Sequence, residues 1–183
     1  MNILASKSQL RASLMRWSLF LVPLIVLLGF LSAQLGSPQT VWFQNLNKPS
    51  FYPPDIAFPI AWSILYALIG FALAMVASAW GAQGRGIAII VFGLHFVGNL
   101  VWTPVFFGMQ DMQTGLYIIG YMAASLIVVM ALFARVRKAA ALLLVPYLAW
   151  TIFAGVLNYQ MIVLNPEDGR STLPDSSVER IEL

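Results

Sequence analysis

Five long stretches of the sequence contain no Asp, Glu, Lys or Arg and are dominated by apolar side chains. They cover residues 17–35, 58–80, 86–106, 113–133 and 139–163. Each can form a helix of about 20 residues, the length that crosses a hydrocarbon core of roughly 30 Å. The runs are continuous, whereas the strands of a membrane β-barrel alternate in polarity over about 10 residues. The pattern therefore predicts an all-α membrane protein, a bundle of five transmembrane helices.

The third run carries polar and aromatic side chains at helical spacing. His95, Asn99, Trp102 and Phe106 follow one another at i, i+4, i+7 and i+11, so they share one helix face. An amide facing lipid would lack hydrogen-bond partners at a cost of several kcal/mol, so this face is expected to point into the bundle. Pro104 is expected to kink the helix and to free a carbonyl one turn earlier.

Two other runs repeat this arrangement. In the second, Trp62 and Tyr66 are i, i+4 neighbours. The fifth carries a similar face, made of Tyr147, Trp150, Ala154 and Asn158. Counted along each helix from its expected outer end, Trp62 lies roughly 6 Å deep and Trp150 about 20 Å deep. Trp150 is therefore too deep for an interfacial tryptophan. The three faces are expected to enclose an aromatic cavity for a large, flat, mostly apolar ligand. Close packing of the aromatics without a void is the alternative.

The longest connection between runs spans residues 36–57 and is rich in proline and aromatic residues. The prolines are Pro38, Pro49, Pro53 and Pro54, and the aromatic residues are Trp42, Phe43, Phe51 and Tyr52. Proline interrupts regular helix and stiffens the backbone. We expect this first loop to fold over the outer mouth of the bundle and cap a ligand pocket. The alternative is an interfacial loop whose aromatics lie at the level of the lipid headgroups.

Composition and charge support a membrane protein and suggest its orientation. The 183 residues are 60% hydrophobic and only 9% charged. Seven of the ten basic residues fall on the side of the amino terminus, and all seven acids fall on the other side. The amino terminus is thus predicted to be cytoplasmic and the carboxyl terminus to lie on the opposite side, with inner or outer membrane left open. The net charge is only +3, and the distribution of the charged residues is explained by membrane topology. Nucleic acid is therefore not an expected partner. The absence of cysteine excludes disulfides and Cys-based metal sites, and no metal site is predicted.

The two ends of the chain are polar. Residues 1–16 are basic and Ser-rich, and residues 165–183 form a polar tail that we expect to be disordered, leaving 17–164 as the membrane domain. The basic start and first apolar run also resemble a signal peptide. Cleavage after Ala33 is a minor alternative because Leu-Ser-Ala is a poor cleavage site.

Four motifs occur in order along the chain. They are Trp42-x-x-Asn45-Leu-Asn-Lys48-Pro49 followed by Pro53-Pro54, Pro59-x-x-Trp62-x-x-x-Tyr66, Asn99-x-x-Trp102-Thr-Pro104-x-Phe-Phe-Gly108, and Pro146-Tyr147-x-x-Trp150 with Leu157-Asn158. Over residues from about 20 to 164 the chain closely resembles the family of tryptophan-rich sensory proteins and translocator proteins, which includes the bacterial TspO and the mitochondrial peripheral-type benzodiazepine receptor.

The resemblance implies a five-helix bundle, commonly a homodimer, that binds porphyrins and other tetrapyrroles in a pocket under the first loop. Eukaryotic members bind cholesterol and benzodiazepine-type drugs, and light- and oxygen-dependent porphyrin degradation has been ascribed to bacterial members. The matching pocket positions are Trp62, Asn99, Trp102, Trp150 and Ala154, with Trp42 and Pro49 from the loop. The chain departs from the eukaryotic cholesterol motif, because no Lys or Arg follows Tyr159 within five residues.

The first functional hypothesis is a membrane tetrapyrrole-binding sensor or carrier with no obligatory cofactor. Ring faces would stack on Trp62 and Trp150, Asn99 and Asn158 would hydrogen-bond polar edges, and Lys48 would either pair with a propionate or remain a solvated loop residue. The candidate ligand-binding residues are Trp42, Lys48, Pro49, Phe51, Trp62, Tyr66, His95, Asn99, Trp102, Tyr147, Trp150, Ala154 and Asn158.

Two further hypotheses are an enzyme and a transporter. The apolar runs hold no Ser-His-Asp set and no paired carboxylates, so an enzyme would depend on photochemistry, with Trp62 and Trp150 as its reactive side chains. A transporter of porphyrins or sterol-like lipids ranks third, because five runs show no two inverted halves. His95 could ligate haem, but a lone buried histidine more often hydrogen-bonds across helices.

Overall fold

The structure is a computed structural model that describes residues 6–167, and every regular element in this range is a helix. The elements are α1 (Lys7–Ala33), α2 (Val41–Asn45), α3 (Ala57–Ala77), α4 (Arg85–Thr103), the π-helix η1 (Pro104–Gly108), α5 (Met112–Val136), α6 (Lys138–Leu143) and α7 (Val145–Leu164). Within residues 6–167, five segments are long and apolar enough to cross a membrane: α1, α3, α4 with η1, α5, and α6 with α7. The predicted all-α architecture with five membrane-spanning helices is confirmed. The expected disorder of the tail concerns residues almost all outside the described range.

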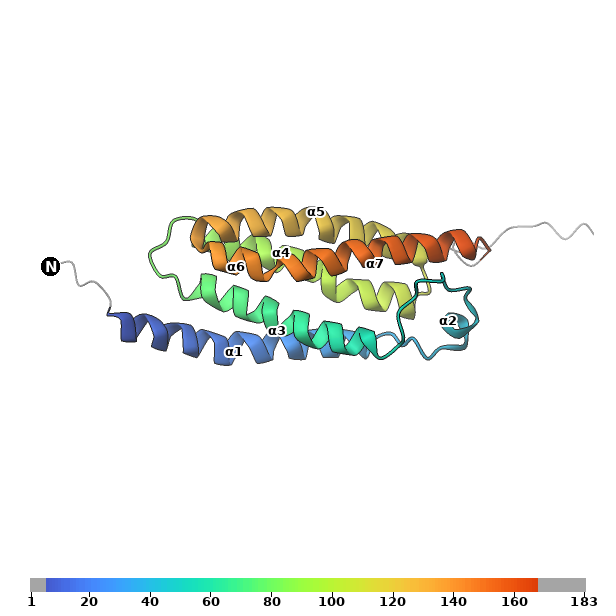
Figure 1. Cartoon of the computed structure of the whole chain (residues 1–183), viewed down its shortest axis with the longest axis horizontal. Coiled ribbons are helices and arrows are strands. Elements are labelled where there is room, and N and C mark those ends of the chain that lie inside the picture. The colour runs from blue at the N-terminus through green and yellow to red at the C-terminus, as the bar shows by residue number, and fades with distance from the viewer. Residues whose placement is uncertain (1–5, 168–183) are drawn as a thin grey trace, which may run out of the picture.

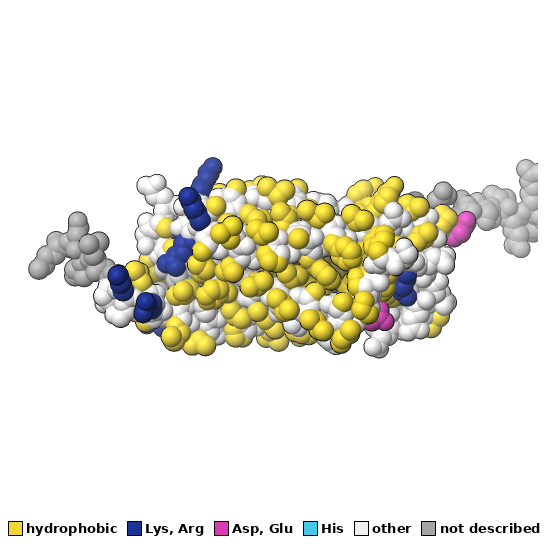
Figure 2. Space-filling model, viewed as in Figure 1, with side chains coloured by type: hydrophobic (Ala, Val, Ile, Leu, Met, Phe, Trp, Pro, Cys, Tyr) yellow, Lys and Arg dark blue, Asp and Glu magenta, His cyan; other side chains and the backbone are white. Residues whose placement is uncertain are grey.

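The long helices run side by side in one elongated bundle (Figure 1). Helix α1 packs along α3, while α5 packs against both α4 and α7. The loop that contains α2 lies at the end of the bundle where α1 ends and α3 begins. The described basic residues other than Lys48 gather at the opposite end (Figure 2). This separation agrees with the predicted charge asymmetry, and the orientation in the membrane stays a prediction.

Helix α1 begins ten residues before the first apolar run, inside the predicted basic segment. A capping box starts it: Ser6 Oγ accepts a hydrogen bond from the Gln9 backbone N–H at 3.2 Å, and Gln9 Oε1 accepts one from the Ser6 N–H at 2.8 Å. The apolar run that begins at residue 17 is therefore the apolar part of a longer helix, because the absence of charge does not mark a helix cap.

Two prolines interrupt the expected continuous helices. The simple kink expected at Pro104 is a π-helical turn, η1, in which the Met109 N–H donates to the Pro104 carbonyl at 2.9 Å. The fifth span is divided at Leu144 into α6 and α7, with Pro146 in the first turn of α7. A helix tolerates proline at that position because the backbone N–H of a first-turn residue would have no intrahelical acceptor.

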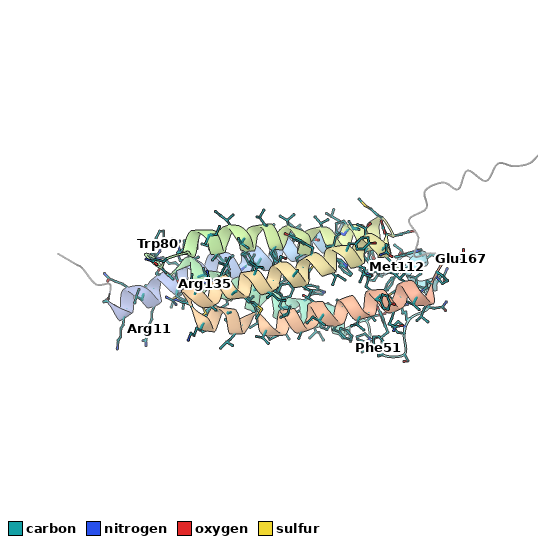
Figure 3. The ribbon with its side chains drawn as sticks, turned by 90° about the horizontal axis from the view of Figure 1, so that it is seen from above. Arg11, Phe51, Trp80, Met112, Arg135 and Glu167 are labelled. Atoms are coloured by element: carbon teal, nitrogen blue, oxygen red, sulfur yellow. The ribbon has the colours of Figure 1, made fainter. Side chains whose placement is uncertain are left out.

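The first loop contains a short helix, α2, although its prolines indicated no regular helix. Thr40 Oγ1 caps α2 by accepting from the Phe43 N–H at 3.3 Å, and the helix ends before Pro49. Phe43 and Leu46 are buried in a small cluster together with Phe106 of η1, Met112 of α5 and Met161 of α7. Figure 3 shows Phe51 and Met112 at this end of the bundle and Trp80 and Arg135 at the other. Burial of these apolar side chains holds the loop against the bundle.

Candidate functional site

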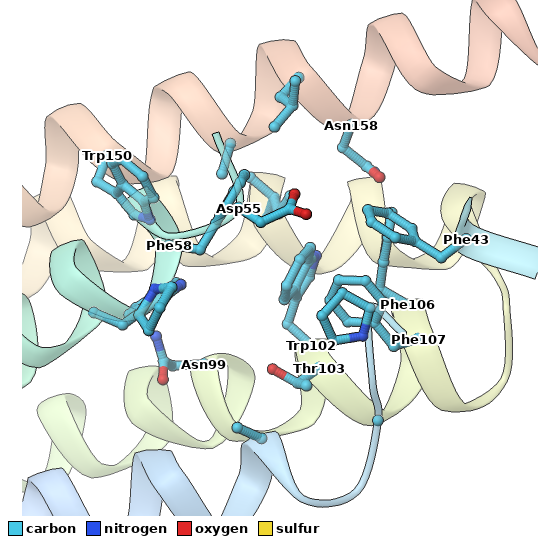
Figure 4. A pocket seen from close by; sticks show the side chains of 18 of the residues that line it. Phe43, Asp55, Phe58, Asn99, Trp102, Thr103, Phe106, Phe107, Trp150 and Asn158 are labelled. Carbon is cyan, nitrogen blue, oxygen red and sulfur yellow. The ribbon is translucent and has the colours of Figure 1, made fainter. Parts of the chain in front are cut away.

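A cavity of about 480 Å³ lies at the loop end of the bundle (Figure 4). Every long helical span and the first loop contribute to its walls. Eight of the predicted site residues line it: Lys48, Trp62, Tyr66, Asn99, Trp102, Trp150, Ala154 and Asn158. The volume falls within the range of typical small-molecule sites, roughly 300–1,000 Å³. The alternative of aromatics packed together without a void does not describe this structure.

Aromatic rings from α3 and α7 meet on one wall of the cavity. The Trp62 ring stacks on Tyr66 with centroids 5.1 Å apart and meets the Trp150 ring edge-to-face at 6.5 Å and 83°. Edge-to-face pairs at this separation are attractive because of the ring quadrupoles. The wall is therefore a surface of indole and phenol rings.

The closeness of Trp62 and Trp150 corrects the depths expected from the sequence. Roughly 6 Å and about 20 Å, counted separately along the two helices, would have placed these rings at different levels. Helix α7 continues past the first turn of α3 toward the loop end (Figure 1), so the two helix ends are not level. The two depths were counted from helix ends at different levels, so they could not be compared. The two rings in fact lie side by side.

A hydrogen-bonded chain of three side chains closes the floor of the cavity. The Tyr66 hydroxyl donates to Asn99 Oδ1 at 3.1 Å, and Asn99 Nδ2 donates to the Tyr147 hydroxyl at 2.9 Å. The chain connects α3, α4 and α7, and all three residues are buried. Tyr147 itself does not line the cavity, so it supports Asn99 from behind. The predicted inward orientation of the Asn99 face is what the structure shows.

His95 lies below this floor and does not line the cavity. Its side chain is fully buried, and Nδ1 lies 2.8 Å from Ser125 Oγ on α5. Ser125 donates its only hydroxyl proton to the Tyr121 carbonyl at 2.7 Å, so Nδ1–H is the donor to Ser125. The placement gives His95 a cross-helix hydrogen bond and no contact with a ligand in this cavity.

Three predicted loop residues also lie off the cavity surface. Trp42 packs on Phe106 with centroids 6.0 Å apart, and the buried Pro49 accepts a hydrogen bond from the Tyr52 N–H at 2.9 Å. Phe51 is 46% exposed, with its ring 6.4 Å from that of Phe153. These residues shape and attach the loop instead of facing the cavity.

Other residues line the cavity although the sequence analysis did not select them. Gly29 and Phe30 come from α1, Ile119 and Met122 from α5, and Asp55 from the loop. At Gly29, a Cβ would overlap the Tyr66 ring, so only glycine lets that tyrosine lie against α1. The glycine within the first apolar run could have indicated a close contact at Gly29. Nothing in the sequence distinguished Ile119 and Met122 from the other apolar residues of their run.

The mouth of the cavity holds one cation and one anion of the first loop, Lys48 and Asp55. Lys48 Nζ lies 4.9 Å from the centre of the Phe43 ring and 5.6 Å from that of Tyr52, within the range of cation–π attraction. Burial, and secondarily the nearby Asp55 carboxylate, raise the pKa of Tyr52 to about 12. The groups that could recognise a polar ligand group at the mouth are thus charged, whereas those in the interior are neutral.

Hydrogen bonds between Asn47 and Asn165 fasten the loop to the end of α7. The Asn47 N–H donates to Asn165 Oδ1 at 2.8 Å, and Asn165 Nδ2 donates to the Asn47 carbonyl at 3.0 Å. Asn165 Nδ2 also donates to the Met161 carbonyl at 2.7 Å, and Asn47 Nδ2 reaches the Leu164 carbonyl at 3.4 Å. We call this pair of asparagines the loop latch.

These features define a multi-pass helical membrane protein with an internal aromatic cavity beside a fastened loop. Residues 20–164 match the model of the TspO/MBR family, and the chain belongs to this family. It is 38% identical over 147 residues to the tryptophan-rich protein TspO of Chlorobaculum tepidum, covering 79% of this chain and 93% of that protein. It is 37% identical over 159 residues to the tryptophan-rich sensory protein of Cereibacter sphaeroides (82% and 94%), and 36% over 140 residues to the translocator protein of Bos taurus (73% and 80%). The family predicted from the four motifs is confirmed.

Proposed function

We propose that this protein binds a tetrapyrrole, such as a porphyrin, in the cavity and acts in the bilayer as a sensor or carrier of that ligand. The observation that carries the proposal is the wall formed by Trp62, Tyr66 and Trp150 beside about 480 Å³ of space. Flat conjugated rings gain both apolar burial and favourable stacking against such a wall. A flexible aliphatic ligand would gain only the burial.

The polar residues of the cavity support the same ligand class. We expect Lys48 at the mouth to pair with a propionate and the interior residues to meet the apolar body of the ring system. Two relatives are named as a sensory protein and a translocator protein, and these names favour sensing or carrying over catalysis. The homodimer that the resemblance implies belongs to this proposal, and light scattering should then give twice the 20.2 kDa mass of the chain.

A fluorescence titration of the protein in nanodiscs with protoporphyrin IX tests the proposal. We expect saturable binding that the double substitution Trp62→Phe/Trp150→Phe weakens about three- to tenfold, because a smaller ring loses stacking area. The matched control is Trp80→Phe, since Trp80 is 68% exposed and lies at the other end of the bundle. Absence of saturable binding, or equal weakening by the control, would contradict the proposal.

A second candidate function is light-driven porphyrin degradation, which the close pair of indoles favours. An excited porphyrin could take an electron from Trp62 or Trp150, whose rings lie 6.5 Å apart, and pass it to dioxygen to give superoxide. The indole radical cation would then take back an electron from the porphyrin, and addition of superoxide to the oxidised ring would open it. Bleaching that requires light and oxygen and stops in the double Trp→Phe variant would support this function. Bleaching at the same rate in that variant would mean that the pigment destroys itself.

A further inference from the structure

The charged groups that border the cavity both belong to the first loop. Of the described residues that line the cavity, two carry a charged side chain, the cation Lys48 and the anion Asp55. Both residues are exposed, so a ligand in the mouth can reach them. The mouth thus has no net charge, but it holds one group that attracts a carboxylate and one that repels it.

The amides of the interior are already engaged by the protein. Asn99 accepts from Tyr66 and donates to Tyr147 through the two ends of its amide. Asn158 Nδ2 donates to the Met112 backbone carbonyl at 2.9 Å. The Oδ1 atom of Asn158 has less than 1 Å² of accessible surface, so a ligand in the cavity cannot reach it. The mouth is therefore where an ionised substituent of a ligand finds a partner.

Tyr52 brings the two charges of the mouth together. Lys48 Nζ lies 5.6 Å from the centre of the Tyr52 ring. Burial raises the pKa of Tyr52, and the charge of the Asp55 carboxylate and a hydrogen bond to it raise this pKa further, so the carboxylate lies beside the Tyr52 hydroxyl. Figure 4 shows the carboxylate of Asp55 directed into the space that the labelled side chains surround. The cation and the anion thus flank the same side chain.

The polar edge of a porphyrin would meet both charges at once. The two propionates of protoporphyrin stand on neighbouring pyrrole rings, so they share one edge of the macrocycle. When one propionate pairs with Lys48, the other is held near the opposite side of Tyr52, where Asp55 lies. Two carboxylates held close together repel each other, whereas a neutral substituent meets no such repulsion.

We infer that Asp55 determines specificity at the mouth and selects a tetrapyrrole whose polar edge carries one carboxylate beside a neutral group. The inference rests on the proposed tetrapyrrole binding and adds which ionic form of the ligand the mouth prefers. A diacid gains the attraction of Lys48 but also meets Asp55, and a diester avoids Asp55 but loses Lys48. A monoacid gains the attraction without the repulsion, which is how like charges reject a wrong partner.

Fluorescence titrations in nanodiscs with protoporphyrin, its monomethyl ester and its dimethyl ester test the inference. For each ligand, the Kd of a variant is divided by the Kd of wild type, so that partition of the ligand into the bilayer cancels. Asp55→Asn removes the repulsion and should tighten the diacid about two- to fivefold more than the monoester, the range of partly exposed charge pairs.

Asp111→Asn is the matched control, because it removes the same charge near the same end of the bundle. Asp111 caps α5 and does not line the cavity, and asparagine is an equally good cap. This control should change the affinities of the diacid and the monoester by the same factor. An equal response of diacid and monoester to Asp55→Asn, or the same difference in the control, overturns the inference while tetrapyrrole binding stands.

Lys48→Gln gives a second, independent test. It should weaken the diacid and the monoester about two- to fivefold and leave the diester unchanged, because the diester has no carboxylate to lose. Equal weakening of all three ligands would show that Lys48 holds the loop without pairing a carboxylate, and it would overturn the inference. No saturable binding of any of the three ligands overturns both the inference and the proposed function.

Discussion

The same apolar helices form both halves of the bundle, but their side chains pack differently in each half. In the half near the basic turns, small and branched side chains such as Ala72, Val76 and Ala88 are completely buried, so the helices approach closely. In the half near the first loop, indole and phenyl rings from facing helices stand around a cavity of about 480 Å³. The comparison teaches that the packing of the side chains, and not their hydrophobicity, separates the closed half near the basic turns from the open half near the first loop, since the closed half also buries rings such as those of Phe92 and Phe133.

The largest effect is expected from adding volume to each half. Ala72→Leu inserts three carbons where no space exists and should lower the free energy of unfolding by about 1–3 kcal/mol. Ala154→Leu places the same group beside the cavity and should cost less than about 1 kcal/mol, while it weakens protoporphyrin binding. Denaturant or thermal unfolding in detergent measures the difference. Equal destabilisation by both substitutions would remove the distinction between the halves.

A smaller effect is expected where the halves meet, at the chain from Tyr66 through Asn99 to Tyr147. Tyr147→Phe leaves Asn99 Nδ2 without its acceptor and should lower the free energy of unfolding by about 1 kcal/mol. Tyr121→Phe is the matched control: its hydroxyl donates to the Leu94 carbonyl on an exposed face, and its loss should have almost no effect. Unfolding measured side by side should rank the two, and a reversed ranking would contradict the assignment.

The loop latch should affect only the open half. Asn165→Ala removes the hydrogen bonds to Asn47, and we expect backbone hydrogen exchange in residues 42–52 to accelerate about tenfold with little change in global stability. Asn45→Ala is the control, because Asn45 lies in the same loop with an exposed side chain. If both variants exchange alike, the latch does not hold the loop.

The smallest effect concerns pH. The pKa of Tyr52 is raised from 10.0 to about 12, chiefly by burial, so folding favours the neutral phenol. The folded state then holds the proton more tightly, and the contribution of Tyr52 to stability is complete below pH 10 and is lost as pH rises through 12. The difference in phenolate absorbance between wild type and Tyr52→Phe should titrate near the upper value. A midpoint near 10.0 would show that the loop leaves Tyr52 in water.

The sequence predicted what depends on periodicity and missed what depends on relative placement. Helical spacing located the faces that carry Trp62, Asn99 and Trp150, and charge-free length located the spans. It could not show that α7 extends past α3, because the offset between helices depends on loops and packing. Nor could it separate Asn99 from Asn158, since spacing gives the direction of a side chain but not its hydrogen-bond partners.

Asn165 ends α7 and holds Asn47 with the same amide group. Unwinding of the last helical turn and release of the loop are therefore coupled events of one equilibrium. Coupling free energies are reciprocal, so any molecule that binds more tightly while the loop is attached must also protect that turn from fraying. Tension applied to the backbone beyond Asn165 would conversely be transmitted, through two asparagines, to the entrance of the cavity.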